Sequence, residues 1–261
     1  NPETYLDSRQ IPCLVVDSVF SLLFLLLALL WSLFNLCRQN SLNANYFAIW
    51  ILELLFSLYC LGDLQLLNYI SHHDGKIQKV GIMDYLSIPL DSFYLSLIIF
   101  ICTGIGYDRP CFTKLLKVTI VVESCIFFFS IQECNRLEIR NYLFIFLCFF
   151  VFILILVLHI QLSIKNYKRI IAHMASISQI GIDPTTSPIE TKRVVFSCLI
   201  LFSMISLVLF MVLSLLSPFL TIDIWIFELI NYTNIYLLLC LYTFLFRPRG
   251  RSIDRYFDAD R

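Results

Sequence analysis

Charged residues are scarce in this sequence, and that scarcity limits the kind of protein it can be. Only 15% of the 261 residues are Asp, Glu, Lys or Arg, whereas 59% are hydrophobic and 24 are Phe. A water-soluble domain could not cover so much apolar surface with so few charges. The formal net charge is zero, so no basic excess favours nucleic acid as a partner. The composition excludes an ordinary soluble protein and gives nucleic-acid binding no support.

Motifs for catalysis or for a bound group are also lacking. The sequence has no His and Glu spacing typical of a metal site and no Gly-x-Ser-x-Gly motif. No Gly-Asp pair is expected to face a second Asp, as it would in a membrane protease. We therefore expect no enzyme activity, no metal and no cofactor. Most of the cysteines lie in apolar segments, where we expect them to be free and buried. His159 stands alone in such a segment and is expected to hydrogen-bond within the protein.

The sequence does have apolar segments of about twenty residues, the length that crosses a hydrocarbon core of about 30 Å. They predict an all-α fold, a bundle of seven transmembrane helices without a separate soluble domain. Residues 165–192 between the fifth and sixth helices contain Gly181, Pro184 and Pro188, which predicts a long exposed loop. The predicted helices span about 11–37, 44–70, 83–106, 115–131, 142–164, 194–216 and 222–246.

The positions of Lys and Arg predict how the bundle is oriented. Seven crossings place the two termini on opposite sides, and cytosolic loops carry the excess of basic residues. Fourteen of the 19 Lys and Arg residues fall on the side of the C-terminus. The N-terminus is therefore expected to be lumenal or extracellular and the C-terminus cytosolic. Five of these basic residues are candidates for a cytosolic interface with a partner or anionic lipid, namely Arg109, Lys165, Lys168, Arg169 and Arg247.

Acidic residues occur inside the predicted helices, whereas every Lys and Arg lies in a connecting segment or at a helix end. An ionised carboxylate facing lipid is costly, so these side chains should face the interior of the bundle, lie in a watery cavity or be protonated. One interpretation is that they join helices by hydrogen bonds of about 0.6 kcal/mol each. The other is a polar cavity, open outward, that holds a cation, protons or the polar part of a ligand. The candidates for this cavity are Asp17, Glu53, Asp91, Tyr94, Glu123, Glu228 and Asn231, and Asp63 is a further acid in a predicted span.

Two familiar kinds of seven-helix protein are disfavoured. A retinal protein needs a lysine in its last helix, and residues 222–246 contain none. Tyr107-Asp108-Arg109 superficially resembles the acid-Arg-aromatic triplet of class A receptors. The Asn-Pro-x-x-Tyr motif of the seventh helix and the mid-helix proline of the sixth are both absent, so conventional G-protein coupling is not favoured.

Three short stretches together resemble the GOLD-domain seven-transmembrane family, also described as lung seven-transmembrane receptor-like proteins. Asn1-Pro2-Glu3-Thr4-Tyr5-Leu6, followed by Ile11-Pro12, resembles the segment before the family's first helix. Thr103-Gly104-Ile105-Gly106-Tyr107 with Pro110 resembles the end of its third helix, and Phe246-Arg247-Pro248 the end of its seventh. The resemblance extends over the whole chain in order and placement. The longer segment after the fifth helix and the short fourth helix depart from the family pattern.

The resemblance implies a lumenal GOLD-type domain before residue 1 and residence in Golgi, trans-Golgi or endosomal membranes, with the plasma membrane as second choice. It implies a role in protein trafficking, with a lumenal cargo protein or lipid and a cytosolic trafficking or signalling partner. The first hypothesis is therefore a non-enzymatic membrane protein that handles cargo or a lipid-linked ligand. The alternatives are an orphan receptor that signals through Arg109, and a cation channel or transporter that uses the intramembrane acids.

Overall fold

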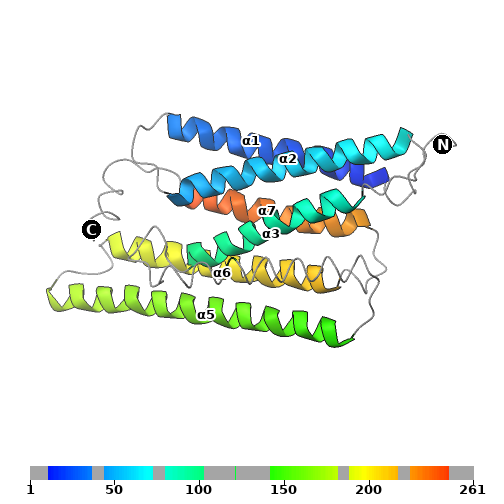
Figure 1. Cartoon of the computed structure of the whole chain (residues 1–261). Coiled ribbons are helices and arrows are strands. Elements are labelled where there is room, and N and C mark those ends of the chain that lie inside the picture. Colours follow the sequence, from blue (N-terminus) through cyan, green and yellow to red (C-terminus); the bar gives the residue numbers. More distant parts are fainter. Residues whose placement is uncertain are drawn as a thin grey trace.

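The computed structural model describes residues 11–36, 44–72, 80–102, 121, 142–181, 188–216 and 224–246. Within these ranges it contains six helices and no strand, as expected for an all-α protein (Figure 1). The predicted fourth helix lies outside the described residues except for Val121, which is helical. The helices are α1 (Ile11–Leu36), α2 (Ala44–His72), α3 (Val80–Cys102), α5 (Tyr142–Gln179), α6 (Pro188–Leu216) and α7 (Ile224–Phe246).

Three helices are long and apolar enough to cross a membrane. The stretches are Ile11–Phe34 in α1, Phe47–Ile70 in α2 and Trp225–Phe244 in α7. Shorter apolar stretches occupy Leu86–Phe100 in α3 and Arg193–Leu209 in α6. A helix rises about 1.5 Å per residue, so the three longer stretches match a hydrocarbon core of about 30 Å. The expectation of a membrane protein agrees with these lengths.

The helices lie side by side in one elongated bundle (Figure 1). α1 packs against α2, and α5 packs against α6. α7 contacts α1, α2 and α6, while α3 contacts α2, α5 and α6. α1, α3, α5 and α7 run in one direction along the bundle, and α2 and α6 run in the other (Figure 1). Residues near the start of α1 and α7 therefore lie at the same end as residues near the end of α2.

Hydrogen bonds from serine and tryptophan side chains join α1 to α2. The hydroxyl of Ser21 donates to the carbonyl of Ser57 at 3.1 Å, and the hydroxyl of Ser57 donates to the carbonyl of Ser21 at 2.9 Å. The indole of Trp50 donates to the hydroxyl of Ser32 at 3.0 Å. Small side chains let two helix backbones approach closely, and hydrogen bonds between them add to the packing in a membrane.

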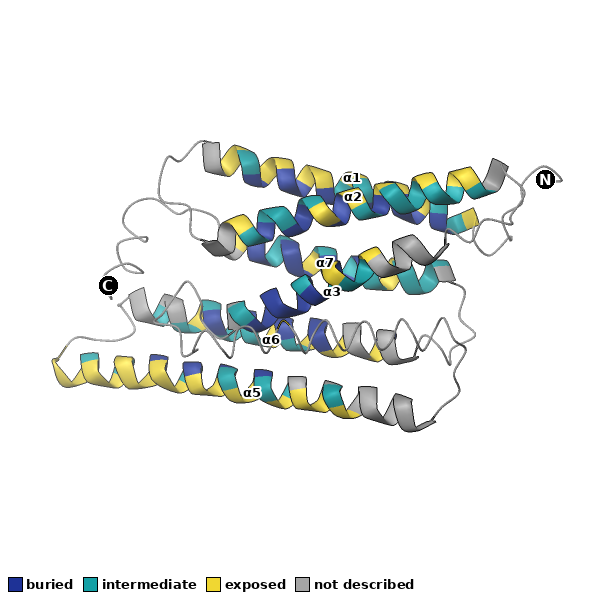
Figure 2. Cartoon of the chain, in the orientation of Figure 1, coloured by how far each residue is buried: buried dark blue, intermediate teal, exposed yellow. Residues whose placement is uncertain are grey.

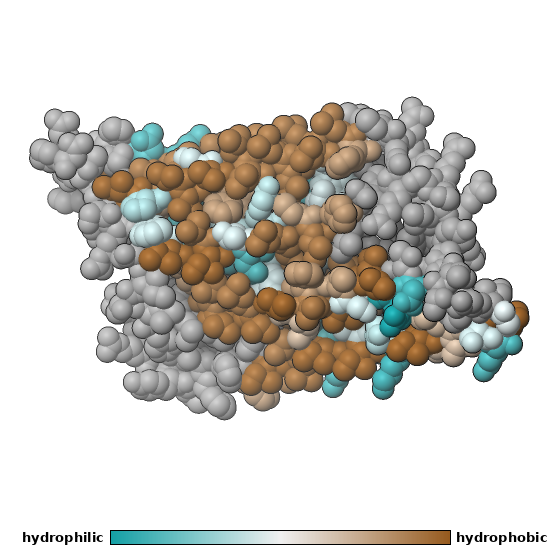
Figure 3. Space-filling model, turned by 180° about the vertical axis from the view of Figure 1, so that it is seen from behind, coloured by the Kyte–Doolittle hydropathy of each residue, from teal (hydrophilic) through white to brown (hydrophobic). Residues whose placement is uncertain are grey.

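The outer surface of the bundle is apolar. Exposed residues follow the outer sides of α1 and α5, whereas buried residues gather toward α7 and α3 (Figure 2). Leu33 of α1 is 58% exposed and Phe150 of α5 is 53% exposed. On the face seen in Figure 3, hydrophobic atoms cover most of the described surface. A surface of this kind is suited to lipid and not to water.

The prediction of a loop over residues 165–192 is wrong. α5 continues to Gln179, and α6 already begins at Pro188. The prediction ended the helix at Ile164 because the apolar run stops there. The following residues nevertheless include good helix formers and contain neither glycine nor proline until Gly181, whose φ of 84° suits glycine alone. Pro188 occupies the first helical position of α6, where its missing N–H costs nothing.

Candidate functional site

Three carboxyl groups gather where α1, α2 and α7 meet. Asp17 lies in the second turn of α1, Glu228 near the start of α7 and Asp63 toward the end of α2. The antiparallel course of α2 brings all three to the same end of the bundle. The carboxyl group of Asp17 interacts electrostatically with those of Glu228 and Asp63. We call Asp17, Asp63 and Glu228 the carboxyl cluster.

The carboxyl cluster is poorly supplied with hydrogen-bond partners. Asp17 is completely buried, and neither of its carboxyl oxygens has a partner among the described residues. Oε2 of Glu228 likewise has none there, although the Glu228 carboxyl group forms a hydrogen bond with the thiol of Cys13. Among the described residues, the electrostatic partners that act on the carboxyl group of Asp17 are the acids Glu228 and Asp63. Leaving a buried polar group unpaired costs about 1–3 kcal/mol, so this arrangement favours a proton or a positively charged or hydrogen-bonding ligand.

Asp63 corrects one expectation from the sequence. It follows Gly62, so a Gly-Asp pair does lie close enough to a second acid, Asp17, for the two carboxyl groups to interact electrostatically. Aspartic catalysis requires two carboxyl groups about 3 Å apart that share one proton. Electrostatic interaction alone does not establish that geometry. Within the described residues, no group of three or more His, Cys, Asp or Glu side chains is arranged to hold a metal ion.

Glu53 belongs to a different layer of the bundle. It is completely buried on α2, and the hydroxyl of Thr243 on α7 lies 3.0 Å from its Oε1 atom. The indole of Trp31 on α1 donates to the same hydroxyl at 2.7 Å. Trp31 and Thr243 lie near the C-terminal ends of their helices, away from the carboxyl cluster. The sequence places Glu53 nearer mid-depth, whereas its partners place it toward the opposite end.

An aromatic layer separates Glu53 from the carboxyl cluster. Phe24 and Phe56 stack with their ring centroids 5.3 Å apart, and Tyr236 packs edge-on against Phe24 at 5.7 Å. In α1 and α7 these rings come after the carboxyl cluster and before Trp31 and Thr243, and in α2 Phe56 lies between Glu53 and Asp63. Phe24 is completely buried, and Phe56 nearly so. The two groups of acids therefore do not form one polar path along α1, α2 and α7.

Asp91 and Tyr94 belong to the contact between α3 and α6. The hydroxyl of Tyr94 lies 2.9 Å from that of Ser206, and Asn234 of α7 donates to the carbonyl of Ser206 at 3.1 Å. Asp91 is half-buried and interacts electrostatically with Tyr94. Asn231, also half-buried, keeps its Oδ1 atom without a hydrogen bond among the described residues. The polar residues of α7 thus have different neighbours, with Glu228 at α1 and Asn234 at α6.

His159 does not behave as expected within the described part of the chain. It is completely buried on α5, yet neither ring nitrogen has a hydrogen-bond partner there. The hydroxyl of Ser163, one turn later, is also buried and unpartnered in the described ranges. The expectation that the cysteines are free is confirmed for the described thiols. Among the described thiols all are free, with Cys13 and Cys60 buried and Cys198 and Cys240 half-buried.

Three of the basic candidates lie on the extension of α5 and not in a loop. Lys165, Lys168 and Arg169 are all exposed there. Close by, Arg193 of α6 pairs with Glu190, and its Nε atom donates to Oε2 of that residue at 2.8 Å. The hydrogen bond from Arg193 lowers the pKa of Glu190. The remaining candidates, Glu123, Arg109 and Arg247, lie outside the described residues.

Comparison with protein-family models and with curated proteins gives no match to this chain.

Proposed function

We propose that the chain is a seven-helix membrane protein of Golgi or endosomal membranes that acts in protein trafficking and has no enzymatic activity. In this proposal the carboxyl cluster receives a positively charged or hydrogen-bonding group of a lumenal cargo protein or lipid-linked ligand. The observation that carries it is Asp17, a fully buried carboxyl group with both oxygens unpartnered among the described residues and with acids as its electrostatic neighbours. A buried polar group that lowers the stability of the fold in this way is typical of a site retained for function.

The course of the chain supports seven crossings. α3 and α5 run in the same direction (Figure 1), which is what one further crossing between them would produce. The sequence predicts one more apolar helix in that interval, over about 115–131. The excess of Lys and Arg on the side of the C-terminus supports a cytosolic C-terminus. The carboxyl cluster then lies toward the lumenal ends of α1 and α7, where a lumenal ligand could reach it.

The family resemblance supports the compartment and the trafficking role. It rests on Asn1–Pro12, on residues 103–110 and on Phe246-Arg247-Pro248. The carboxyl cluster adds a location for ligand binding that the resemblance does not supply.

Cargo sorting in cells that lack the protein tests this proposal. The unsubstituted chain should restore sorting, whereas the double variant Asp17→Asn, Glu228→Gln should reach the same membranes and fail to restore it. Ser18→Ala is the matched control, because Ser18 is exposed on α1 and its hydroxyl donates to the carbonyl of Leu14 in the same helix. Residence of the wild-type protein solely at the cell surface would contradict the proposed compartment. Normal sorting by the double variant would contradict the proposed site.

Transport of protons or a cation is the second candidate function. This function is supported by two buried acids at different depths where α1, α2 and α7 pack together. Asp17 lies toward one end of these helices and Glu53 toward the other. The aromatic layer of Phe24, Phe56 and Tyr236 between them disfavours a continuous path. Flux measurements on purified protein in liposomes separate the two functions. A flux that depends on both Asp17 and Glu53 would support transport as the function in place of ligand handling.

A further inference from the structure

One side of α5 is available for lipid along most of its length. Phe150, Leu154, Val157 and Ile164 are all exposed, and they follow one another at intervals of four, three and seven residues, that is, one or two helical turns. Such spacing places side chains on one side of a helix. In Figure 2 this side of α5 is exposed over the described residues. Within a bilayer these side chains would contact acyl chains.

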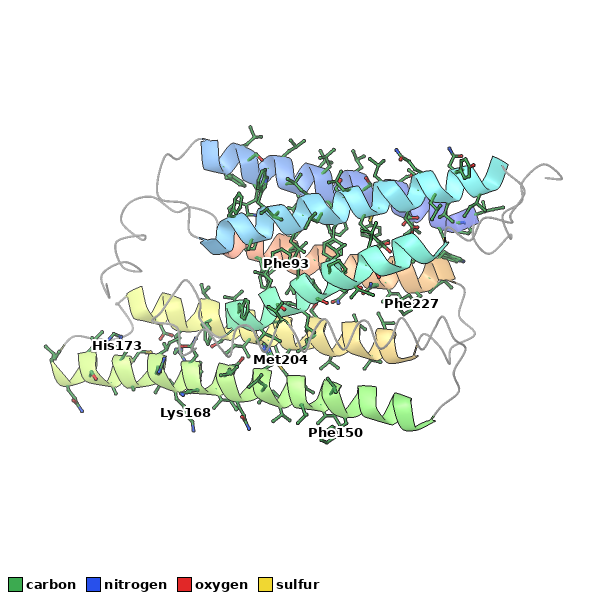
Figure 4. The ribbon with its side chains drawn as sticks, viewed as in Figure 1. Phe93, Phe150, Lys168, His173, Met204 and Phe227 are labelled. Atoms are coloured by element: carbon green, nitrogen blue, oxygen red, sulfur yellow. The ribbon has the colours of Figure 1, made fainter. Side chains whose placement is uncertain are left out.

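The same side of α5 continues into basic residues. Gln161, Ile164, Lys168 and Ile171 follow at intervals of three or four, and all four are exposed. Figure 4 shows Phe150 and Lys168 pointing away from the bundle on the same side of α5. Lys168 is thus an ammonium group on a lipid-facing surface, with an exposed isoleucine about one turn before it and another one turn after it. This pattern is typical of the boundary between acyl chains and headgroups, where lysine keeps its stem in the apolar layer and its charge in the polar one.

Among the described residues, no acid neutralises the basic side chains of α5. Lys165 and Arg169 flank Lys168, and in the described ranges no acidic side chain pairs with any of the three. The nearby Glu190 is engaged by Arg193. Arg193 also forms a hydrogen bond with Tyr167 of α5. This bond joins α6 to the side of α5 opposite the basic residues.

The buried side of this part of α5 explains why the basic residues point outward. Ser163, Asn166 and Ile170 are 2%, 3% and 6% exposed and share one side of the helix. Because that side packs within the bundle, α5 cannot turn about its axis to bring Lys165 and Lys168 toward the protein. The orientation of the basic side is therefore set by packing.

We propose that Lys165, Lys168 and Arg169 bind an anionic phospholipid of the cytosolic leaflet. Its phosphate lies among the three basic side chains, and an acyl chain follows Val157 and Ile164. Charge complementarity and the continuous apolar side of α5 favour a membrane lipid over a soluble acidic protein, because a soluble partner would not use the apolar part. The inference rests on the proposed cytosolic end of α5 and not on the trafficking role.

Lipid titration of the purified full chain, followed by native mass spectrometry, tests this site. Phosphatidylserine should bind at least tenfold more tightly than phosphatidylcholine. The triple variant Lys165→Gln, Lys168→Gln, Arg169→Gln should lose that preference, since each basic residue near an anionic surface strengthens binding roughly fivefold. The matched control is Ala172→Gln, Ala175→Gln, Ser176→Gln, which places three glutamines at exposed positions of the next turns without removing charge. It should bind as the wild type does.

Three outcomes would overturn the lipid site. They are equal binding of the two lipids by the wild type, an undiminished preference in the triple glutamine variant, and full competition by equimolar soluble glycerophosphoserine. A charge-retaining variant, Lys165→Arg, Lys168→Arg, Arg169→Lys, should keep the preference, which separates loss of charge from loss of folding.

A second measurement keeps this inference separate from the proposed function. Ser176→Cys should gain labelling by a membrane-impermeant maleimide from the cytosolic face, relative to the unsubstituted chain. Labelling from that face without selective lipid binding would overturn the lipid site alone. Labelling only from the other face would overturn the proposed orientation, and the cytosolic lipid site with it.

Discussion

The indole N–H of Trp31 donates a hydrogen bond of 2.7 Å to the hydroxyl of Thr243, so the first and last helices of the chain are joined inside the bundle. Thr243 has one hydrogen to donate, but two acceptors lie within reach. They are Oε1 of Glu53 at 3.0 Å and the carbonyl of Leu239 at 2.8 Å. A protonated Glu53 satisfies both, because Glu53 then donates to Thr243 and Thr243 donates to Leu239. Trp31, Glu53 and Thr243 therefore link α1, α2 and α7 through one hydroxyl group.

Thr243→Val is expected to lower the stability of the protein by about 1–3 kcal/mol. It keeps the shape of the side chain and removes the hydroxyl, so the buried Trp31 N–H and the buried Glu53 carboxyl group each lose one hydrogen-bond partner. Thr243→Ser is the control and should stay close to wild type, because it keeps the hydroxyl. Thermal unfolding of detergent-purified protein measures the difference. Equal stability of the valine and serine variants would show that the link contributes nothing.

Glu53→Gln tests the protonation state directly. An amide can donate to Thr243 as a protonated carboxyl group does, so this variant should unfold within about 1 kcal/mol of wild type. Glu53→Ala should be clearly less stable, since it leaves a cavity and removes the contact with Thr243. If Glu53→Gln unfolds as readily as Glu53→Ala, an ionised Glu53 is required and the hydrogen-bond assignment is wrong.

Asp17→Val should make the protein more stable while removing its function. The substitution replaces a buried, unpartnered carboxyl group by an apolar side chain of comparable size, with an expected gain of about 1–3 kcal/mol. Ser18→Ala, on the exposed side of the same turn, should change stability little. The thermal midpoint in detergent is the measurement. A lower midpoint for Asp17→Val would mean that Asp17 has a stabilising partner, and the proposed ligand site would lose its main support.

A double-mutant cycle on Tyr94 and Ser206 measures the hydrogen bond between α3 and α6. Tyr94→Phe and Ser206→Ala each remove one hydroxyl of the 2.9 Å contact. The bond from Asn234 goes to the carbonyl of Ser206 and is kept in both variants. The coupling energy should be about 0.6 kcal/mol, and no more than about 1.7, as for other hydrogen bonds between membrane helices. Additive effects of the two substitutions would indicate that the hydroxyls do not interact.

The apolar runs predict the membrane helices well, because crossing a bilayer demands a length that the sequence displays directly. α1, α2 and α7 begin and end close to the predicted residues. The sequence also indicates which pairs of polar residues share a side, such as Asp17 with Ser21 and Glu53 with Ser57. It cannot indicate that Ser21 and Ser57 form hydrogen bonds with each other, because that depends on the relative position of α1 and α2 along their axes.

The division of the acids into two layers could not be predicted for the same reason. Their depth along each helix can be read from the sequence, but the partners come from helices that are distant in sequence, as with Glu53 and Thr243. The early start of α6 is different, because the sequence contains a signal for it. Ser187-Pro188-Ile189-Glu190 has the sequence of a helix start, with Ser before Pro and Glu at the third helical position. Recognising it would have shortened the predicted loop.

Acid should loosen the start of α6, because the carboxylate of Glu190 is stabilised there. The hydrogen bond from Arg193 is the largest cause of the lowered pKa of Glu190, whose ordinary value is near 4.5. A pKa that is lower in the folded state stabilises the fold above the ordinary value, and this contribution is lost as the pH falls through the lowered one. Hydrogen exchange of the second turn of α6, whose N–H groups bond to the carbonyls of the first turn, should therefore be slow near neutral pH. After correction for intrinsic rates, it should accelerate at acidic pH below about 4.5. Glu190→Gln cannot titrate, so its exchange should be faster at neutral pH and show no such acceleration. Wild-type exchange that is independent of pH across this range, or equal to that of Glu190→Gln at neutral pH, would show that the pair with Arg193 does not hold the helix start.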